Sequence, residues 1–479
     1  MARHDPNRKL AALLREAQWS AGELARAVNA LGTAQGVRLR YDRTSVAHWL
    51  TGSRPRPPVP DLVAAAFTQR LGRLVTPLDA AITEDRPAPA PPADPGGADA
   101  LPGLMELCRE DADPELRASL AAGAYTLGTV SSLTWRTDED DCAAPPSSEP
   151  GIASTPGIAS TPGIASTARI ASAAGIASTA GPGNAAEVEA LEEMTRLFAG
   201  ASLRHGGGHA RTALVSYIGD DASRLLSRPA PDRIRAELLT STAQLTHLLA
   251  EMSADDDRPG LAQRYFHLAL SLSQEAGNRR QYAITLRAMG AQAGRLRHHL
   301  YALQVSESAV EAAGSGADAD TLAFLLVQRA LARAQEGHRR AALDDLVTAE
   351  RLHSRAGSPA GPFASYPRAG LDYQRAEALL ALGNRPEGQA CLETSLEHRP
   401  TGQHRPLALT HARLARALLH AGQLEAACTH WHRFLDHYPH LHSAQVRQEI
   451  AQLAQHLRPH LRQRRAAGVL ERSRTLVAL

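Results

Sequence analysis

Residues 41–55 read Tyr-Asp-Arg-Thr-Ser-Val-Ala-His-Trp-Leu-Thr-Gly-Ser-Arg-Pro, a pattern typical of a short helix that ends at Gly52 and Pro55. Asp42 is suited to cap the start of this helix, because an aspartate side chain accepts hydrogen bonds from the free amides of the first turn. Glycine and proline both interrupt helices, so the helix has a defined end as well as a defined start.

The apolar residues of this helix share one face. Val46, Trp49 and Leu50 recur at spacings of three and four residues, which places them on one buried stripe. The opposite face carries small or hydrogen-bonding side chains, which suit the major groove of DNA. These outward residues are Arg43, Thr44, Ala47 and His48.

Helical patterns on both sides of this stretch complete a small bundle. We expect a first helix over residues 10–18, a second over Ser20–Leu31 and a fourth over roughly Pro60–Leu71. Glu23 lies three residues after Ser20, which is the spacing of a capping box. Several short helices, of which the third is polar and bears an arginine, describe a helix-turn-helix bundle.

The bundle resembles Cro/repressor-type DNA-binding domains. Two segments carry the resemblance, Trp19-Ser-Ala-Gly-Glu-Leu-Ala25 and Ser45-Val-Ala-His-Trp-Leu-Thr-Gly52. The chain departs from that family at residues 32–40, which add several residues where the family has a tight turn. The resemblance implies that the third helix binds double-stranded DNA.

We predict DNA contacts on and around the third helix. Arg43 and Thr44 lie on its first turn and are expected to read bases, with His48 one turn later at the edge of the groove. Flanking arginines are expected to bind phosphates. The full predicted set is Arg38, Arg40, Arg43, Thr44, Ser45, His48, Arg54 and Arg56.

Charge is concentrated in the same region. Residues 1–75 contain 12 basic and 5 acidic residues, a net charge of +7, whereas the whole chain is only +2. The remaining residues therefore sum to −5. A basic module joined to a mildly acidic body is what a phosphate-binding domain attached to an interaction domain should have.

The composition predicts an all-α protein of several domains. The chain has 479 residues, only 4% of which are aromatic, and alanine and leucine supply most of its apolar mass. It contains no apolar run long enough for a signal peptide or a membrane span, and its four cysteines lack metal-site spacing. We therefore expect a cytoplasmic, nucleoid-associated protein that has no membrane contact, metal or cofactor.

Two low-complexity stretches divide the chain after an N-terminal domain at residues 1–83. Residues 84–102 are dominated by Pro, Ala, Gly and Asp and are expected to be a linker. Residues 137–183 carry tandem Ile-Ala-Ser hexads. A left-handed β-helix would need more hexads than these, so a disordered tether is favoured. Residues 103–136, which lie between the linkers, predict a short helical segment.

Within that segment we expect helices over Leu104–Arg109 and Pro114–Ser132. The segment is too small to fold alone, so we expect it to dock on the C-terminal domain or on a partner subunit.

A loose internal repeat runs through residues 184–466, followed by a tail at 467–479. The repeat is marked by aligned alanines and by glycines between paired helical patterns. The alanines are Ala262, Ala302, Ala342, Ala390 and Ala427, and the glycines are Gly337, Gly383 and Gly422. Paired helices with small residues at their contacts resemble tetratricopeptide repeats, so a helical solenoid is expected.

The combination of parts resembles a group of large Streptomyces regulators of differentiation and antibiotic production. It joins the Cro-like bundle, a Pro-rich hinge, Arg204-His-Gly-Gly-Gly-His209 and Gly260-Leu-Ala-Gln-Arg-Tyr265 to the repeats. The resemblance implies a transcriptional regulator of development or secondary metabolism. Its repeats would form a homodimer and bind an effector, a peptide or a protein partner.

The sequence does not predict an enzyme. His205–His209 is glycine-rich, but no nucleophile motif accompanies it, and glycines between two helices usually form a turn. The histidines between His430 and His442 match no zinc signature and are expected to be a solvated surface. Asp255–Asp257 is expected to end a helix, because the other ligands of a calcium site are missing.

Two other interpretations remain open. The chain could be a scaffold that acts through its repeats without binding DNA, or a peptide-sensing regulator with the same layout. The polar face of Arg43–Leu50 favours DNA binding, because a protein-binding helix more often presents large apolar anchors.

Overall fold

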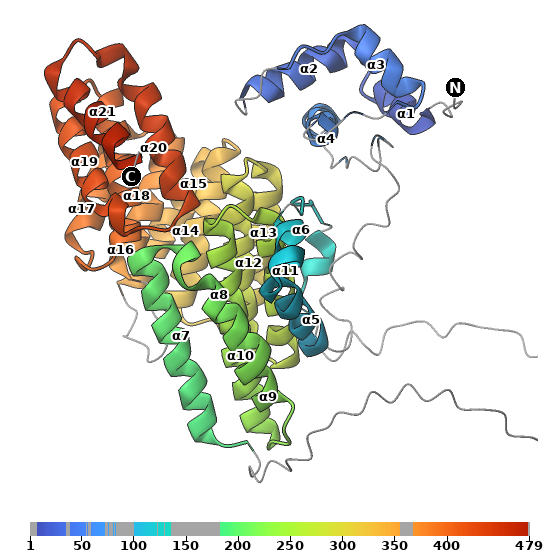
Figure 1. Ribbon diagram of the computed structural model, residues 1–479, viewed down its shortest axis with the longest axis vertical. Coiled ribbons are helices and arrows are strands. Elements are labelled where there is room, and N and C mark those ends of the chain that lie inside the picture. The colour runs from blue at the N-terminus through green and yellow to red at the C-terminus, as the bar shows by residue number, and fades with distance from the viewer. Residues whose placement is uncertain are drawn as a thin grey trace, which may run out of the picture. The chain divides into compact units, whose positions relative to one another are not determined.

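The computed structural model describes residues 7–34, 39–53, 55, 59–71, 75, 80, 82, 100–121, 123–128, 130–135, 183–354 and 367–477. Within these ranges every regular element is a helix, which confirms the predicted all-α class (Figure 1). The helices belong to two compact units, one built on residues 1–93 and the other on residues 94–125 and 130–479. The hexads and most of both predicted linkers lie outside the described residues.

The N-terminal unit is a bundle around one apolar core. Its helices are α1 (Arg8–Glu16), α2 (Ala21–Ala34), α3 (Arg43–Leu50) and α4 (Val59–Leu71). The predicted capping box is present, because the amide and hydroxyl of Ser20 both donate to the Glu23 carboxylate at 2.7 Å. Fully buried residues from all four helices form the core, among them Leu10, Leu24, Val28, Val46, Leu62 and Phe67.

The C-terminal unit contains the remaining helices. It begins with α5 (Ala100–Ala112), α6 (Pro114–Ala121) and a 3-10 turn, η1 (Val130–Leu133). Next come α7 (Ala185–His205), α8 (Gly207–Tyr217), a π-helical turn η3 (Ile218–Ala222), α9 (Ser223–Leu226), α10 (Asp232–Asp255), α11 (Pro259–Glu275), α12 (Arg279–Arg295), α13 (His299–Ala313), α14 (Ala319–Gln335) and α15 (Arg339–His353). The last are α16 (Arg368–Ala381), α17 (Arg385–Glu397), α18 (His404–His420), α19 (Leu424–His437), η4 (Tyr438–His440), α20 (Ala444–Leu457), η5 (Arg458–His460) and α21 (Arg464–Val477).

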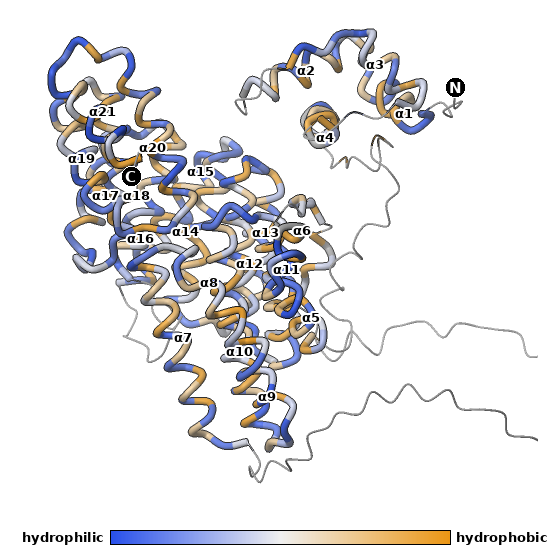
Figure 2. The backbone as a smooth tube through the Cα atoms, viewed as in Figure 1, coloured by the Kyte–Doolittle hydropathy of each residue, from blue (hydrophilic) through white to orange (hydrophobic). Residues whose placement is uncertain are grey.

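From α10 to α19 the unit is a series of helical hairpins, in which α10 packs on α11, α12 on α13, α14 on α15, α16 on α17 and α18 on α19. Figure 2 shows apolar and polar segments alternating along these helices, as expected of helices that bury one face. The C-terminal helical repeat region is therefore confirmed.

The second helix of each hairpin follows a residue with a positive backbone φ. These residues are Asp257 (62°), Arg297 (66°), Gly337 (81°), Gly383 (79°) and Gly422 (76°). Glycine adopts this conformation without steric cost, which explains the predicted turn glycines. Asp257 and Arg297, which are not glycines, adopt the same backbone conformation at a modest conformational cost.

The common turn sets the register of the repeat, and it corrects one predicted alignment. Gly388 occupies the position that Ala262, Ala302, Ala342 and Ala427 occupy in the other hairpins, four residues after each N-cap. Gly388 is buried, and a Cβ there would lie 2.8 Å from Leu380 Cγ. The predicted marker Ala390 is wrong because it is exposed, two residues beyond the contact between the helices.

Three boundaries in this unit differ from the predicted ones. Helix α5 begins at Ala100, inside the stretch expected to be a linker to residue 102. The helix predicted over Pro114–Ser132 is wrong beyond Ala121, because residues 123–128 have no regular structure. There the Gly123 carbonyl lies so close to Gly260 that a Cβ on Gly260 would meet it at 2.2 Å. At the other end, α21 buries Val469 and Leu470, so helical packing continues past residue 466.

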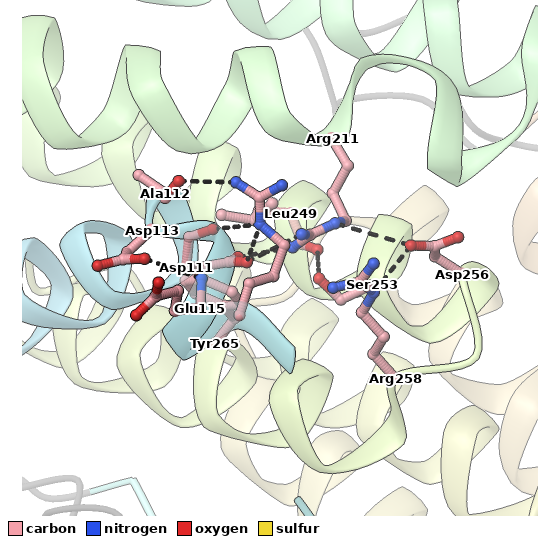
Figure 3. Close-up of polar contacts among 11 residues, drawn as sticks. Asp111, Ala112, Asp113, Glu115, Arg211, Leu249, Ser253, Asp256, Arg258 and Tyr265 are labelled. Atoms are coloured by element: carbon pink, nitrogen blue, oxygen red, sulfur yellow. Dashed lines mark hydrogen bonds and ion pairs between the residues drawn. The ribbon is translucent and has the colours of Figure 1, made fainter. Parts of the chain in front are cut away.

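A buried aspartate fixes α5 to the repeat region (Figure 3). The Asp111 side chain is fully buried and accepts hydrogen bonds from two nitrogens of Arg211, at 2.6 and 2.8 Å. The Tyr265 hydroxyl also donates to Asp111, at 2.9 Å. Since these partners lie on α8 and α11, the segment packs on the C-terminal domain, one of the two docking sites expected for it.

Candidate nucleic-acid interface

Helix α3 is held at its start by the residue predicted to cap it. The Asp42 carboxylate accepts a hydrogen bond from the Ser45 amide at 2.9 Å, and the Ser45 hydroxyl completes a capping box with the Asp42 amide. Hydrogen bonds from the Ser45 amide and hydroxyl lower the pKa of Asp42, so the cap stays charged at neutral pH. A negative charge at this end also stabilises the helix dipole.

This cap changes the role of one predicted site residue. The Ser45 hydroxyl lies 2.9 Å from Asp42 Oδ1 and the side chain is half-buried, so the hydroxyl is occupied within the helix. We therefore assign Ser45 to holding the first turn, and its direct contact with DNA stays a prediction.

The buried face of α3 is the predicted one. Val46 is fully buried, Trp49 is 4% exposed and Leu50 packs against the same core. Tyr41 meets the Trp49 ring edge-on, with centroids 5.2 Å apart. The bulk of Trp49 and its fixed orientation thus set the rotation of α3 about its own axis.

That rotation leaves the opposite face in solvent. Arg43, Thr44, Ala47 and His48 are all exposed, as the sequence predicted. They combine a guanidinium, a hydroxyl, a methyl and an imidazole, which are the groups that donate to, accept from or pack against base edges in a major groove. The structure therefore brings together the residues predicted to read bases.

The residue that follows the insertion, Tyr41, is tied to α2 by a side chain that sequence reasoning missed. The Asn29 amide nitrogen donates to the Tyr41 carbonyl at 2.7 Å, and its oxygen accepts from the Tyr41 amide at 2.9 Å. These two bonds fix the backbone just before the Asp42 cap. An asparagine on the inner side of a helix before an insertion was the only available signal.

The flanking arginines divide into described and undescribed residues. Arg40 is exposed two residues before the cap, where a long side chain has access to a neighbouring phosphate. The predicted phosphate contacts Arg38, Arg54 and Arg56 lie outside the described residues. Further exposed basic side chains on this unit are Arg8, Lys9, Arg15, Arg26 and Arg70.

The glycine-rich stretch of the C-terminal unit joins the two ends of the repeat array. The His442 amide donates to the His205 carbonyl at 2.7 Å, and the Gly208 amide donates to the His442 carbonyl at 2.9 Å. A Cβ on Gly207 would lie 2.6 Å from the Met252 carbonyl oxygen. These glycines therefore allow close backbone contact.

Asp255 holds the same junction. Its buried carboxylate accepts from the Gly207 amide at 2.8 Å, from Arg405 at 2.9 Å and from the Ser443 hydroxyl at 2.7 Å. Burial alone would raise the pKa of Asp255, but Arg405 and these hydrogen bonds lower it. Because α18 also packs on α7, the repeat array curls back on its own first helices.

The solvated histidine surface expected between His430 and His442 is present at His440 and His442, which are exposed, but is wrong for His430, His432 and His437, which are partly buried. His411 is 5% exposed, and its Nδ1 lies 3.0 Å from Nδ1 of His430. Nδ1 of His404 lies 3.0 Å from Nδ1 of His437. No group of three or more metal-ligating side chains in the described part of the chain could hold a metal ion.

A protein-family model described as the SP15 N-terminal domain matches residues 10–83, the stretch that contains α2, α3 and α4 and most of α1. No curated protein matches the chain. In the described ranges, no helix is long and apolar enough to cross a membrane.

Proposed function

We propose that this chain is a DNA-binding transcriptional regulator without catalytic activity. Helix α3 enters the major groove of double-stranded DNA, where Arg43 and Thr44 contact base edges and His48 lies at the groove edge. Arg38, Arg40, Arg54 and Arg56 contact phosphates on either side. One observation carries the proposal: a capped helix exposes hydrogen-bonding side chains, in a region whose net charge is +7.

The C-terminal helical repeats give the regulator its other contacts. We propose that they form a homodimer, because one eight-residue helix contacts a single half-site and dimers are the usual way to bind two. They also bind an effector or a protein partner. The likeness to Streptomyces regulators supports genes of development or secondary metabolism as targets, and a location at the nucleoid.

Chromatin immunoprecipitation with sequencing of the full chain tests this proposal. We expect enrichment at discrete promoters, and specific binding of the purified chain to the recovered fragments. Arg43→Ala should weaken specific binding by about 1–3 kcal/mol and relax the preference at one base pair. Arg233→Ala is the matched control, because Arg233 is an exposed arginine in the C-terminal unit, with 89% of its side chain accessible.

The salt response separates the proposal from its alternative. A phosphate-binding unit should show a log–log slope of about −0.9 for each phosphate contacted. Absence of enrichment together with absence of binding to every fragment would leave the chain as a scaffold that acts through its repeats.

A further inference from the structure

A hollow opens among four helices of the repeat region, α16, α17, α18 and α20. Its volume is about 340 Å³, near the lower end of the range for small-molecule pockets, which is about 300–1,000 Å³. Most of its lining side chains are basic. The lining consists of Leu380, Arg385, Arg413, Arg416, Ala417, His420 and His456.

Two of these arginines are held in place by partly buried acids. Arg413 forms an ion pair with Glu377, and Arg416 Nη1 lies 3.0 Å from Glu449 Oε2. Both arginines stay partly accessible, with 28% and 17% of their side chains exposed. Because a guanidinium has more N–H donors than one carboxylate accepts, each retains donors for a ligand in the hollow.

The third arginine supplies the charge that the acids do not balance. Arg385 is exposed at the start of α17 and pairs with no carboxylate among the described residues. The hollow and its supporting pairs thus hold three arginines against two carboxylates. Burial raises the pKa of Glu449, even though Arg416 and Arg413 act to lower it. The partial burial of Glu449 therefore disfavours its charged form.

We propose that this hollow binds a carboxylate group, carried either by a small organic acid or by the C-terminus of a peptide. A guanidinium matches the two oxygens of a carboxylate in one plane, and three arginines converge on this hollow. A dianion such as phosphate is disfavoured by the charges of Glu377 and Glu449.

This inference rests on the effector-binding part of the proposed function, and it is tested on the full chain without DNA. Isothermal titration uses four probes: a pool of N-acetylated tetrapeptides with free C-termini, the same pool as C-terminal amides, succinate, and inorganic phosphate. We expect the free-acid peptides or succinate to bind, and the amides and phosphate not to. Binding of peptides alone identifies a C-terminus as the source, and binding of succinate alone identifies a small acid.

Two variants locate the binding site. Arg385→Gln should weaken binding of the acid by at least about tenfold, because it removes a charged donor without breaking an ion pair. Arg233→Gln, on the exposed surface of α10, should leave the affinity unchanged. Equal binding of acids and amides, tighter binding of phosphate, no binding of any acid, or unchanged affinity in Arg385→Gln with an unaltered melting temperature would each overturn the proposal.

Discussion

Arg211→Met should loosen the attachment of α5 to the C-terminal unit by about 3 kcal/mol. Breaking a buried ion pair costs about 3–5 kcal/mol, because the remaining charge loses its partner. Here Asp111 would lose hydrogen bonds of 2.6 and 2.8 Å but keep the Tyr265 hydroxyl at 2.9 Å. Arg117, whose Nε lies 3.7 Å from Asp111, compensates part of the charge, so we expect the lower end of the range.

A double-mutant cycle separates the pair from its surroundings. Asp111→Leu leaves the Arg211 guanidinium buried at 3% exposure and should also destabilise the attachment. The double variant Asp111→Leu/Arg211→Met removes both charges, so it should cost much less than the sum of the single changes.

Hydrogen–deuterium exchange of the α5 backbone amides measures this effect locally. A loss of about 3 kcal/mol should speed exchange over Ala100–Ala112 by roughly a hundredfold. Arg233→Met serves as the control, because that side chain is 89% exposed. Unchanged protection of α5 in Arg211→Met, or strict additivity in the cycle, would refute a buried pair as the anchor.

Three further perturbations follow from the structure. Trp49→Ala should unfold the N-terminal unit, since truncating a buried tryptophan costs roughly 3–5 kcal/mol, and loss of amide protection in α1–α4 with an unchanged C-terminal unit would show it. Gly207→Ala should destabilise the junction by about 1–3 kcal/mol, because the added Cβ would lie 2.6 Å from the Met252 carbonyl oxygen. Gly468→Ala is the control and should be neutral or stabilising, because a Cβ there has nothing within 4 Å. Equal melting temperatures of the two variants would contradict this prediction. Burial, then His430 and His437, lowers the pKa of His411 from 6.5 to about 3. The unfolded chain therefore binds a proton that the folded chain does not, so stability is full above pH 6.5 and falls toward pH 3, and His411→Gln should flatten that fall in melting temperature.

The helices of the N-terminal unit were predictable because their signals are local. Capping residues such as Ser20 and Asp42 lie within three residues of their partners, and the spacing of Val46 and Trp49 alone indicates which face is buried. The exposed face of α3 follows from the same periodicity. That these side chains contact DNA is still a prediction.

Contacts between distant segments were not predictable in this way. Asp111 and Arg211 are 100 residues apart, and Asp255 and Ser443 are 188 apart, so neither pair leaves a periodic trace in the sequence. Gly206 separates two helices as the sequence predicted, but Gly207 and Gly208 begin α8, and the backbone of His442, which lies close to Gly206 and Gly208, is far along the chain. The predicted repeat alignment was wrong at Ala390, because in this hairpin the equivalent buried position is occupied by Gly388 instead of alanine.

DNA binding by α3 is the central claim, and a salt titration of the full chain on a recovered promoter fragment tests it most directly. Fluorescence anisotropy from about 50 to 200 mM salt should show specific binding that weakens steeply, by several decades if many phosphates are contacted. Arg43→Ala should reduce the preference for that fragment over random DNA, and Arg233→Ala should not. A flat salt response, or equal loss of specific and random binding in Arg43→Ala, would contradict the account.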